Sequence, residues 1–317
     1  MFLYICYCFL ILFFYVDQTN TQRIPFDTIV SFGDSNTDTG KVYNLTYRAW
    51  PIVPPYYEGR FSNGPVWIEK LGISDLKNYA HGGATTDDNL TQGYTASDTK
   101  RVPGVRQQIQ IYLNETNRDR INFARTLYVI WAGGNDYYFN RMITPLNVTT
   151  SILNGVKDLI NIGVKHLLIV NQSPTQTMPF IESQAQADYF KQRTIYHNNN
   201  LSSSIKKLDY NRQEISLYLF DVYSLILNLT TNNSTDILKT KSSCWKIIYG
   251  NVNILCSNPD SYVYIDQYHF SARMHEFIGN AVLQFLSNSS KTMKSSFSLN
   301  VILCTLAFLT RILCATF

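Results

Sequence analysis

Short apolar runs alternate with helical stretches along this chain. This alternation limits the possible folds more than any other feature of the sequence. Four runs are rich in β-branched or aromatic residues, and glycine or polar residues end them, which is typical of buried strands. These runs are residues 28–32, 126–131, 164–170 and 215–220. Helical patterns occupy residues 151–163 and 185–209. Strands separated by helices predict an α/β fold with a parallel sheet that is covered on both faces.

Polar residues that could carry chemistry directly follow two of these runs. Ser35 comes after the first run across a Gly-Asp turn, and Asn135 comes after the second run across a Gly-Gly turn. In an open parallel sheet, ligands bind beyond the carboxyl ends of the strands. We therefore expect both residues at the same edge of the sheet.

The start of the chain predicts a secretory signal peptide at residues 1–19. The apolar stretch from Phe2 to Val16 is too short to span a bilayer comfortably, and polar residues follow it at once. The stretch has no basic n-region and no clear small-x-small cleavage site. An uncleaved anchor is therefore the alternative.

Residues 291–317 form a polar spacer and an apolar tail. The small residues at 287–290, the spacer and the apolar end match the layout of a lipid-anchor attachment signal. Arg311 interrupts the apolar run, and an arginine at mid-membrane costs roughly 3 kcal/mol on insertion scales. A membrane helix and a tail without function are therefore kept as alternatives. Any membrane attachment is expected to run through this tail.

Residues 24–290 are expected to form one domain, because no repeat, low-complexity linker or composition break divides them. The basic residues outside this range are Arg23, Lys291, Lys294 and Arg311, and the acidic one is Asp17. The domain therefore keeps 23 of 27 basic residues and 22 of 23 acidic residues. A domain this close to neutral does not support nucleic-acid binding. We expect it to be a monomer.

Cysteines and glycosylation motifs both indicate export. Only Cys244 and Cys256, of six cysteines, lie in the predicted domain, and their spacing allows a disulfide that closes a short loop. The domain also carries many Asn-x-Ser/Thr sequons. Among them are those at Asn44, Asn89, Asn114, Asn147 and Asn228. We therefore expect a secreted glycoprotein that is extracellular or held at the cell surface.

Ser35 is the candidate nucleophile. Gly33 lies two residues before it, and a glycine at a strand end allows a sharp turn that leaves the hydroxyl accessible. The alternative role is a helix N-cap, which is a common use of serine after a strand. The chain contains no G-x-S-x-G elbow, which counts against an α/β-hydrolase.

His269 is the candidate general base. Of the five histidines, only His269 has a carboxylate three residues earlier, at Asp266. On a turn or a short helix this spacing puts both side chains on one face, so Asp266 could orient the imidazole as in catalytic triads. Structural roles are expected for His81 and His166, and solvated helix positions for His197 and His275.

Gly83 and Asn135 are candidate oxyanion donors, through a backbone N–H and a side-chain amide, together with the N–H of Ser35. Taken singly, Gly83 could be an ordinary turn glycine and Asn135 an ordinary turn residue. Acyl transfer needs a nucleophile, an oriented base and donors aimed at the developing oxyanion. With Asp266 and His269, each requirement has a candidate, and the pattern predicts a serine ester hydrolase.

Four motifs, taken in the order in which they occur along the chain, resemble those of the SGNH hydrolases, also called GDSL-type esterases and lipases. The resemblance covers nearly all of the predicted domain. The motifs are SFGDSNTDTG, NYAHGGATT, WAGGNDYY and YIDQYHF. The resemblance implies a three-layer α/β/α sandwich around a parallel sheet of flavodoxin-like type, with no metal or organic cofactor. It implies a catalytic triad of Ser35, Asp266 and His269. It also implies an oxyanion hole of Ser35, Gly83 and Asn135.

Two positions depart from the usual pattern of this family. Asn36 stands where the name-giving motif has leucine, at a position that varies and carries no chemistry. His81 lies close to Gly83, where small or apolar residues are more usual. Neither departure removes a residue of the predicted site.

Within the family, residues 56–67 are similar to secreted eukaryotic members, especially fungal carbohydrate acetyl esterases. This resemblance implies a serine carboxylic ester hydrolase that acts on short acyl groups and deacetylates plant-wall carbohydrates. The alternatives are a lipase or phospholipase of the same family and a catalytically idle surface glycoprotein. A polysaccharide lyase is disfavoured, because no paired carboxylates or metal cluster stand out in the sequence.

Five aromatic residues are expected near the mouth of the site, where they would stack on sugar rings or contact acyl chains, although core packing is expected for several. They are Trp50, Tyr56, Tyr57, Tyr137 and Tyr138. The expected partner is therefore an ester, either an acetylated carbohydrate or a lipid.

Overall fold

The computed structural model describes residues 24–95, 100–210, 214–231, 239–248, 250–254 and 256–289. The predicted signal peptide and the predicted tail at 291–317 lie outside these residues. Contacts divide the chain into one unit of Pro25–Leu286 and another of Met1–Ile24 with Ser287–Phe317. The first unit contains the sheet and the candidate site. No helix within the described ranges has the length and apolar character needed to cross a membrane.

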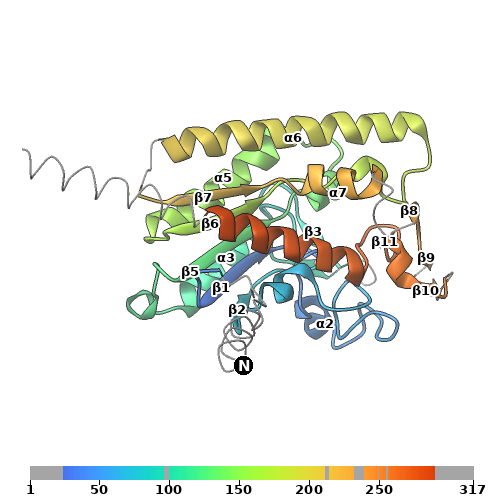
Figure 1. Ribbon diagram of the computed structural model, residues 1–317, viewed down its shortest axis with the longest axis horizontal. Coiled ribbons are helices and arrows are strands. Elements are labelled where there is room, and N and C mark those ends of the chain that lie inside the picture. Colours follow the sequence, from blue (N-terminus) through green and yellow to red (C-terminus); the bar gives the residue numbers. More distant parts are fainter. Residues whose placement is uncertain are drawn as a thin grey trace, which may run out of the picture. The chain divides into compact units, whose positions relative to one another are not determined.

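Within the described residues, five parallel strands form the central sheet in the order β2-β1-β5-β6-β7 (Figure 1). Their bounds are β1 Thr28–Gly33, β2 Asp75–Asn78, β5 Thr126–Trp131, β6 His166–Val170 and β7 Ser216–Phe220. The four strands predicted from apolar runs are confirmed, and β6 and β7 are slightly shorter than predicted. The apolar pattern does not predict β2, whose sequence DLKN is polar and partly exposed, as suits an edge strand.

The strand order determines where a ligand can bind. Numbered along the chain within this sheet alone, the strands lie in the order 2-1-3-4-5, which is the flavodoxin-like arrangement. The direction of the crossovers reverses between β1 and β5, which pair from Thr28 with Thr126 to Gly33 with Trp131. Ligands bind beyond the carboxyl ends of the strands at such a switch point. Because Ser35 follows β1, as predicted from the sequence, it lies at this switch point.

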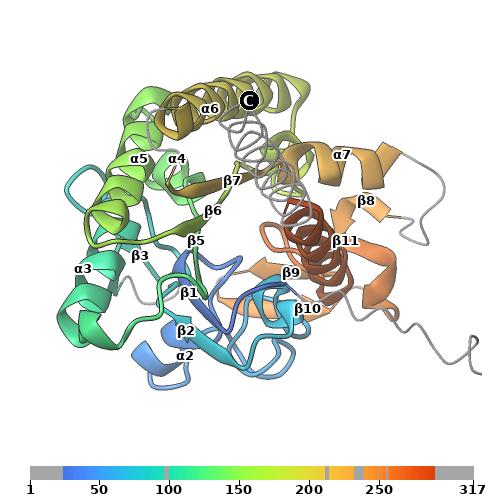
Figure 2. The same ribbon diagram turned by 60° about the vertical axis from the view of Figure 1, so that its left-hand side comes forward.

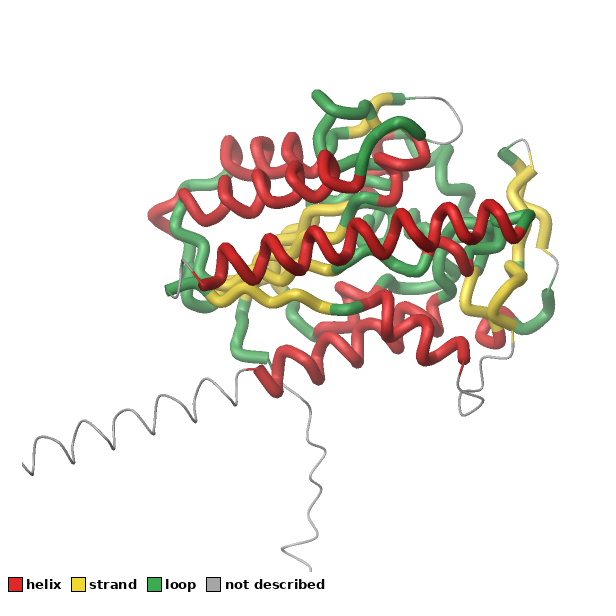
Figure 3. The backbone as a smooth tube through the Cα atoms, turned by 90° about the horizontal axis from the view of Figure 1, so that it is seen from above, coloured by secondary structure: helices red, strands yellow, loops and turns green. Residues whose placement is uncertain are grey.

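Helices cover both faces of the sheet (Figure 2). One face carries α3 (Val105–Glu115), α5 (Pro145–Asn161) and α6 (Gln184–Tyr210), and the other carries α7 (Val222–Thr231) and a helix that begins at residue 272. In Figure 3, helices lie above and below the strands in the view, and a long helix crosses in front of them. The two predicted helices correspond to α5 and α6. The predicted three-layer α/β/α sandwich around a parallel sheet is therefore confirmed.

Shorter elements occupy the connections. The short helices are α2 (Lys41–Leu45), η1 (Trp67–Leu71), η2 (Arg118–Arg120), α4 (Gly134–Phe139), η3 (Thr175–Thr177) and η4 (Pro259–Ser261). Within the described residues, small sheets pair β3 (Gly93–Tyr94) with β4 (Arg101–Val102), β9 (Trp245–Ile248) with β10 (Asn251–Ile254), and β8 (Lys239–Ser243) with β11 (Tyr262–Tyr264). The last of these, β11, leads directly into the segment that carries the predicted base.

Apolar burial holds the sheet in place. All six residues of β5 are buried, as expected for a strand that is covered on both faces. On one face, Phe32 and Ile130 of the strands pack in a cluster with Ile109 of α3, Val156 of α5 and Leu201 of α6. Removing apolar surface from water stabilises such a cluster by roughly 25 cal/mol per Å². The sheet is therefore a firm base for the loops at its carboxyl edge.

A disulfide joins Cys244 to Cys256, with Cα atoms 5.0 Å apart, so the predicted pairing is present. The N–H of Cys244 donates to the carbonyl of Tyr264 at 3.2 Å, and the N–H of Trp245 donates to the carbonyl of Ile265 at 2.6 Å. The bridged segment therefore hydrogen-bonds to the residues that immediately precede the predicted catalytic Asp-His pair.

We expect the change Cys256→Ser to lower the free energy of unfolding by roughly 3 kcal/mol, because a disulfide restricts the unfolded chain. The two bridged cysteines are 12 residues apart in the sequence, so the closed loop is short. Denaturant unfolding of the parent and the variant measures the difference. Reductant should bring the parent down to the level of the variant. An equal unfolding free energy for both proteins without reductant would show that the bridge does not form.

Candidate active site

The turn after β1 presents Ser35. A Cβ atom on Gly33 would lie 2.4 Å from the carbonyl oxygen of Trp131, so only glycine fits at the end of this strand. The side-chain amide of Gln108 holds both peptide groups of Gly33, accepting from its N–H and donating to its carbonyl at 2.9 Å each. Ser35 then lines a cavity of about 550 Å³. The sequence pattern gave no reason to single out Gln108.

Ser35, His269 and Asp266 form a continuous hydrogen-bonded chain. The Oγ of Ser35 lies 3.0 Å from Nε2 of His269. On the other side of the ring, Nδ1 lies 2.7 Å from Oδ2 of Asp266 and 3.0 Å from its Oδ1. Oδ1 also accepts the backbone N–H groups of Tyr268 and His269 at 2.7 and 2.9 Å. The predicted three-residue spacing is thus realised on a turn, which brings all three predicted side chains together.

The environment of Asp266 keeps its carboxylate charged. Complete burial on its own raises the pKa, but attraction to His269, the hydrogen bond from its ring and a hydrogen bond from Tyr56 outweigh burial. The pKa of Asp266 therefore lies below its ordinary value. In catalytic triads, an ionised carboxylate in this position fixes the tautomer of the imidazole and stabilises the imidazolium that forms when the base takes a proton.

Gly83 lines the same cavity. Its φ of 82° is in the left-handed region, and a Cβ atom would lie 2.1 Å from the carbonyl oxygen of Tyr94. Both observations require glycine. The side-chain amide of Asn135, in the first turn of α4, donates to the carbonyl of Ala84 at 3.0 Å. Since an amide has two N–H groups, this bond orients Asn135 next to Gly83 while using only one of them.

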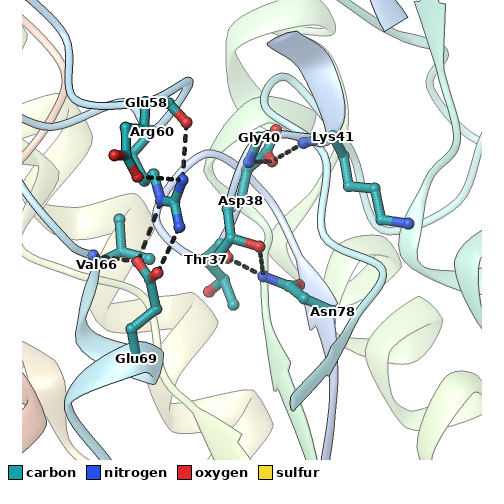
Figure 4. A network of polar contacts seen from close by, with 10 residues as sticks. Thr37, Asp38, Gly40, Lys41, Glu58, Arg60, Val66, Glu69 and Asn78 are labelled. Carbon is teal, nitrogen blue, oxygen red and sulfur yellow. Dashed lines mark hydrogen bonds and ion pairs between the residues drawn. The ribbon is translucent and has the colours of Figure 1, made fainter. Parts of the chain in front are cut away.

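The loops that carry Ser35 and Gly83 are tied together by Asp38. Its buried carboxylate accepts four backbone N–H groups, from Gly40 at 2.8 Å, Lys41 at 2.6 Å, Val42 at 3.1 Å and Gly82 at 2.8 Å. Figure 4 shows the contacts with Gly40 and Lys41. An Asp that bonds the backbone two residues on is a common turn device, which is the only indication of this role in the sequence.

Two further buried carboxyls lie at the site, and the sequence pattern did not identify them. Burial raises the pKa of Asp34, which lines the cavity, to about 6. Burial raises the pKa of Asp136 to about 7, although its carboxylate accepts the N–H and hydroxyl of Thr86 at 2.9 and 2.6 Å. Because these groups bind protons more tightly when folded, their contribution to stability weakens as pH rises from about 4 through these values.

The expectation that His197 and His275 are solvated on helices is wrong. Both side chains are buried, and burial lowers the pKa of each to about 3. Nδ1 of His197 lies 2.7 Å from the hydroxyl of Tyr137, and Nδ1 of His275 accepts the N–H of Trp67 at 3.3 Å. The helical pattern around them did not reveal that their faces pack inward. Of the histidines, His269 lies against Ser35.

The aromatic residues predicted near the mouth divide into two groups. Trp50, Tyr137 and Tyr138 line the cavity. Tyr56 is buried, with its hydroxyl on Asp266, and neither Tyr56 nor Tyr57 borders the cavity; the mouth prediction is wrong for these two. Other apolar walls come from Phe61, Phe139, Met178, Phe180, Phe190 and Tyr268. The cavity next to Ser35 is therefore rich in aromatic side chains.

We expect Asn135→Ala to lower kcat by about 10²–10³-fold with a smaller effect on KM, because an oxyanion donor acts mainly in the transition state. Hydrolysis of a p-nitrophenyl ester by parent and variant gives both constants, and thermal unfolding controls for the lost bond to Ala84. If KM rose tenfold while kcat stayed at the parent value, Asn135 would be a ground-state binding residue instead.

The chain is similar in sequence to known proteins. Residues 29–282 match the family described as GDSL-like Lipase/Acylhydrolase. A phosphatidylcholine-sterol acyltransferase of Aeromonas hydrophila is 30% identical over 60% of this chain and 58% of its own length. An acetylesterase of Hypocrea jecorina is 25% identical over 84% of this chain and 90% of its own length.

The chain spans only part of several relatives. It covers 58%, 65% and 50% of three of the curated proteins that it matches. Among solved structures, a member of the lipolytic protein G-D-S-L family from Veillonella parvula aligns with a TM-score of 0.47 and 13% identity, over 81% of this chain and 96% of that protein.

Proposed function

The chain belongs to the GDSL-like lipase/acylhydrolase family, and we propose that it hydrolyses carboxylic esters with Ser35 as the nucleophile. The observation that carries this proposal is the chain of contacts from Ser35 Oγ to His269 Nε2 at 3.0 Å and from His269 Nδ1 to Asp266 Oδ2 at 2.7 Å. The base is then within hydrogen-bond reach of both the nucleophile and the orienting carboxylate.

The reaction follows from these positions. Ser35 Oγ attacks the ester carbonyl carbon while His269 Nε2 takes its proton. The carbonyl oxygen becomes an oxyanion, which the N–H groups of Ser35 and Gly83 and the amide of Asn135 stabilise. Collapse expels the alcohol, which receives the proton from His269, and leaves an acyl group on Ser35. Water, activated by His269, then releases the carboxylic acid.

For the substrate we propose short acyl esters, with acetylated plant-wall carbohydrates as the natural class. The similarity to an acetylesterase supports this choice, and exposed rings at the cavity, such as Tyr138, are suited to stacking on sugars. The enzyme is proposed to be a secreted monomer, made with a signal peptide at 1–19 and either released or held at the surface through residues 291–317.

A lipase or phospholipase is the second candidate. The many aromatic side chains of the lining favour it, and a volume of about 550 Å³ can bury more than an acetyl group. The similarity to a phosphatidylcholine-sterol acyltransferase points the same way. Both candidates use the same hydrolytic residues and differ in what occupies the cavity.

A chain-length series separates the candidates. The purified protein is assayed with p-nitrophenyl acetate, butyrate, octanoate and palmitate, and then with acetylated xylan oligomers and phosphatidylcholine vesicles. Higher kcat/KM for acetate and butyrate with release of acetate from xylan is the expected result. A higher kcat/KM for octanoate with release of fatty acid selects the lipase. A folded protein that hydrolyses none of these esters contradicts the proposal of an enzyme.

A further inference from the structure

A buried tyrosine extends the hydrogen-bonded chain by one member. The hydroxyl of Tyr56 donates to Oδ2 of Asp266 at 2.6 Å. The same oxygen is the nearer partner of Nδ1 of His269, at 2.7 Å. Tyr56 is 1% exposed and Asp266 is fully buried. Four groups therefore lie in sequence, from the Tyr56 hydroxyl through Asp266 and His269 to the hydroxyl of Ser35.

The protonation states of this pair fix the direction of the bond. Burial and the neighbouring charge of Asp266 raise the pKa of Tyr56 well above its ordinary value, so the phenol keeps its proton. The pKa of Asp266 is lowered, so the carboxylate accepts. Together with the two backbone N–H groups on Oδ1, Tyr56 gives the carboxylate a hydrogen-bond donor in addition to the imidazole. A buried charge without such partners would be costly.

The packing around Tyr56 holds its ring in one position. Its ring centroid lies 5.1 Å from that of Trp245 and 6.0 Å from that of Trp50, both edge-on. Trp245 follows the disulfide residue Cys244, and its backbone bonds to the carbonyl of Ile265. The segment that contains Trp245 therefore contacts both Tyr56 and the residue that precedes Asp266.

The loop that carries Tyr56 is itself anchored by an ion pair (Figure 4). Arg60 contacts Glu69 at 2.6 Å and donates to the carbonyl of Glu58 at 2.8 Å. One residue beyond Arg60, Phe61 places its ring 5.0 Å from that of His269. This loop therefore contacts both members of the Asp-His pair, one through a hydroxyl and the other through a ring.

We propose that Tyr56 is a positioning residue of the hydrolytic site, which acts on His269 through Asp266; the inference rests on the proposed function. Its hydroxyl shares the charge of the carboxylate and holds it against the imidazole. Without that hydroxyl, the negative charge of Asp266 is no longer shared with a second side-chain donor, so the carboxylate stabilises the imidazolium of His269 more strongly. The imidazole is then protonated at higher pH, and the orientation of the pair is less fixed.

The test compares Tyr56→Phe with Tyr112→Phe. The control also removes a buried tyrosine hydroxyl that takes part in a hydrogen bond. The hydroxyl of Tyr112 lies 2.7 Å from that of Tyr128, in the hydrophobic cluster on one face of the sheet. For Tyr56→Phe we expect kcat to fall about tenfold, a loss similar to that seen when the group that orients a metal-ligating histidine is removed, with KM within about twofold of the parent. The acid limb of kcat/KM moves to higher pH. The control keeps the parent pH profile.

Either of two results overturns the proposal: a pH profile for Tyr56→Phe equal to that of the parent, or an equal displacement in Tyr112→Phe. Incorporating 3-fluorotyrosine at position 56 keeps the ring and provides a stronger donor, so it guards against a variant that fails to fold. Its acid limb should move to lower pH, opposite to that of Tyr56→Phe, and an upward displacement contradicts the proposal.

A readout without substrate separates this inference from the proposed function. An NMR titration of the His269 ring in parent and Tyr56→Phe should show the ring titrating at higher pH in the variant. A displaced titration in a protein that hydrolyses no ester would overturn the function and retain the positioning role. An unchanged titration in an active enzyme would overturn the positioning role and retain the function.

Discussion

Ser35→Ala is expected to abolish ester hydrolysis, with a loss on the order of 10⁶ in kcat, as when the nucleophile of a serine protease is removed. The change removes only the hydroxyl group, whose Oγ lies 3.0 Å from Nε2 of His269, the atom that would take its proton. Folding should not suffer, because the turn depends on Gly33 and on its bonds to Gln108. Steady-state kinetics on p-nitrophenyl acetate and thermal unfolding check the two expectations.

A serine outside the cavity provides the matched control. Ser224, in the first turn of α7, donates its hydroxyl to Asp221 at 2.6 Å and does not line the cavity. Ser224→Ala should therefore keep the parent kcat and KM. If Ser35→Ala kept more than about a hundredth of the parent kcat, the nucleophile would have to be another residue.

The change Asp266→Asn is expected to lower kcat by about 10⁴-fold, the loss seen when the orienting carboxylate of a triad becomes an amide. The amide cannot hold the same tautomer of His269 or balance its positive charge. The imidazolium is then less stabilised, so the acid limb of kcat/KM should move to lower pH. This displacement is opposite to that expected for Tyr56→Phe. The measurement is the pH–rate profile of the parent and of both variants.

Stability gives a second check on Asp266. Its pKa is lower in the folded protein than the ordinary 3.8, so its contribution to stability is fully present above that value and is lost as pH falls through the folded pKa. The difference in unfolding free energy between parent and Asp266→Asn should therefore shrink below about pH 4. An unchanged rate together with an unchanged acid limb would remove Asp266 and His269 from the site.

Local pattern was sufficient to predict most of the sheet. The β1 and β5 segments are short apolar runs that end at glycine, and burial on both faces makes that pattern recognisable. The edge strand β2 pairs with β1 on one side only, so its polar sequence gave no such pattern. The strand order itself depends on crossovers, which the pattern of apolar runs does not encode.

The predicted site residues share a feature that sequence can reveal, since each lies in a short motif next to a strand end or a turn. The contacts of Tyr56 with Asp266 and of Asp38 with Gly82 join segments 210 and 44 residues apart. Nothing local to Tyr56 distinguishes a hydroxyl on a buried carboxylate from a ring at the mouth of a cavity. The burial of His197 likewise depends on the packing of α6, whose pattern is only weakly amphipathic.

The most direct test of the central claim is labelling with a p-nitrophenyl phosphonate. Attack by Ser35 Oγ on phosphorus forms a covalent Ser35–phosphonate bond and releases p-nitrophenolate, while His269 takes the hydroxyl proton. We expect one equivalent of p-nitrophenolate per protein, loss of esterase activity, and one adduct located by mass spectrometry on Ser35. Ser35→Ala should release none. An adduct on another residue, or equal release from Ser35→Ala, would contradict the assignment of Ser35 as the nucleophile.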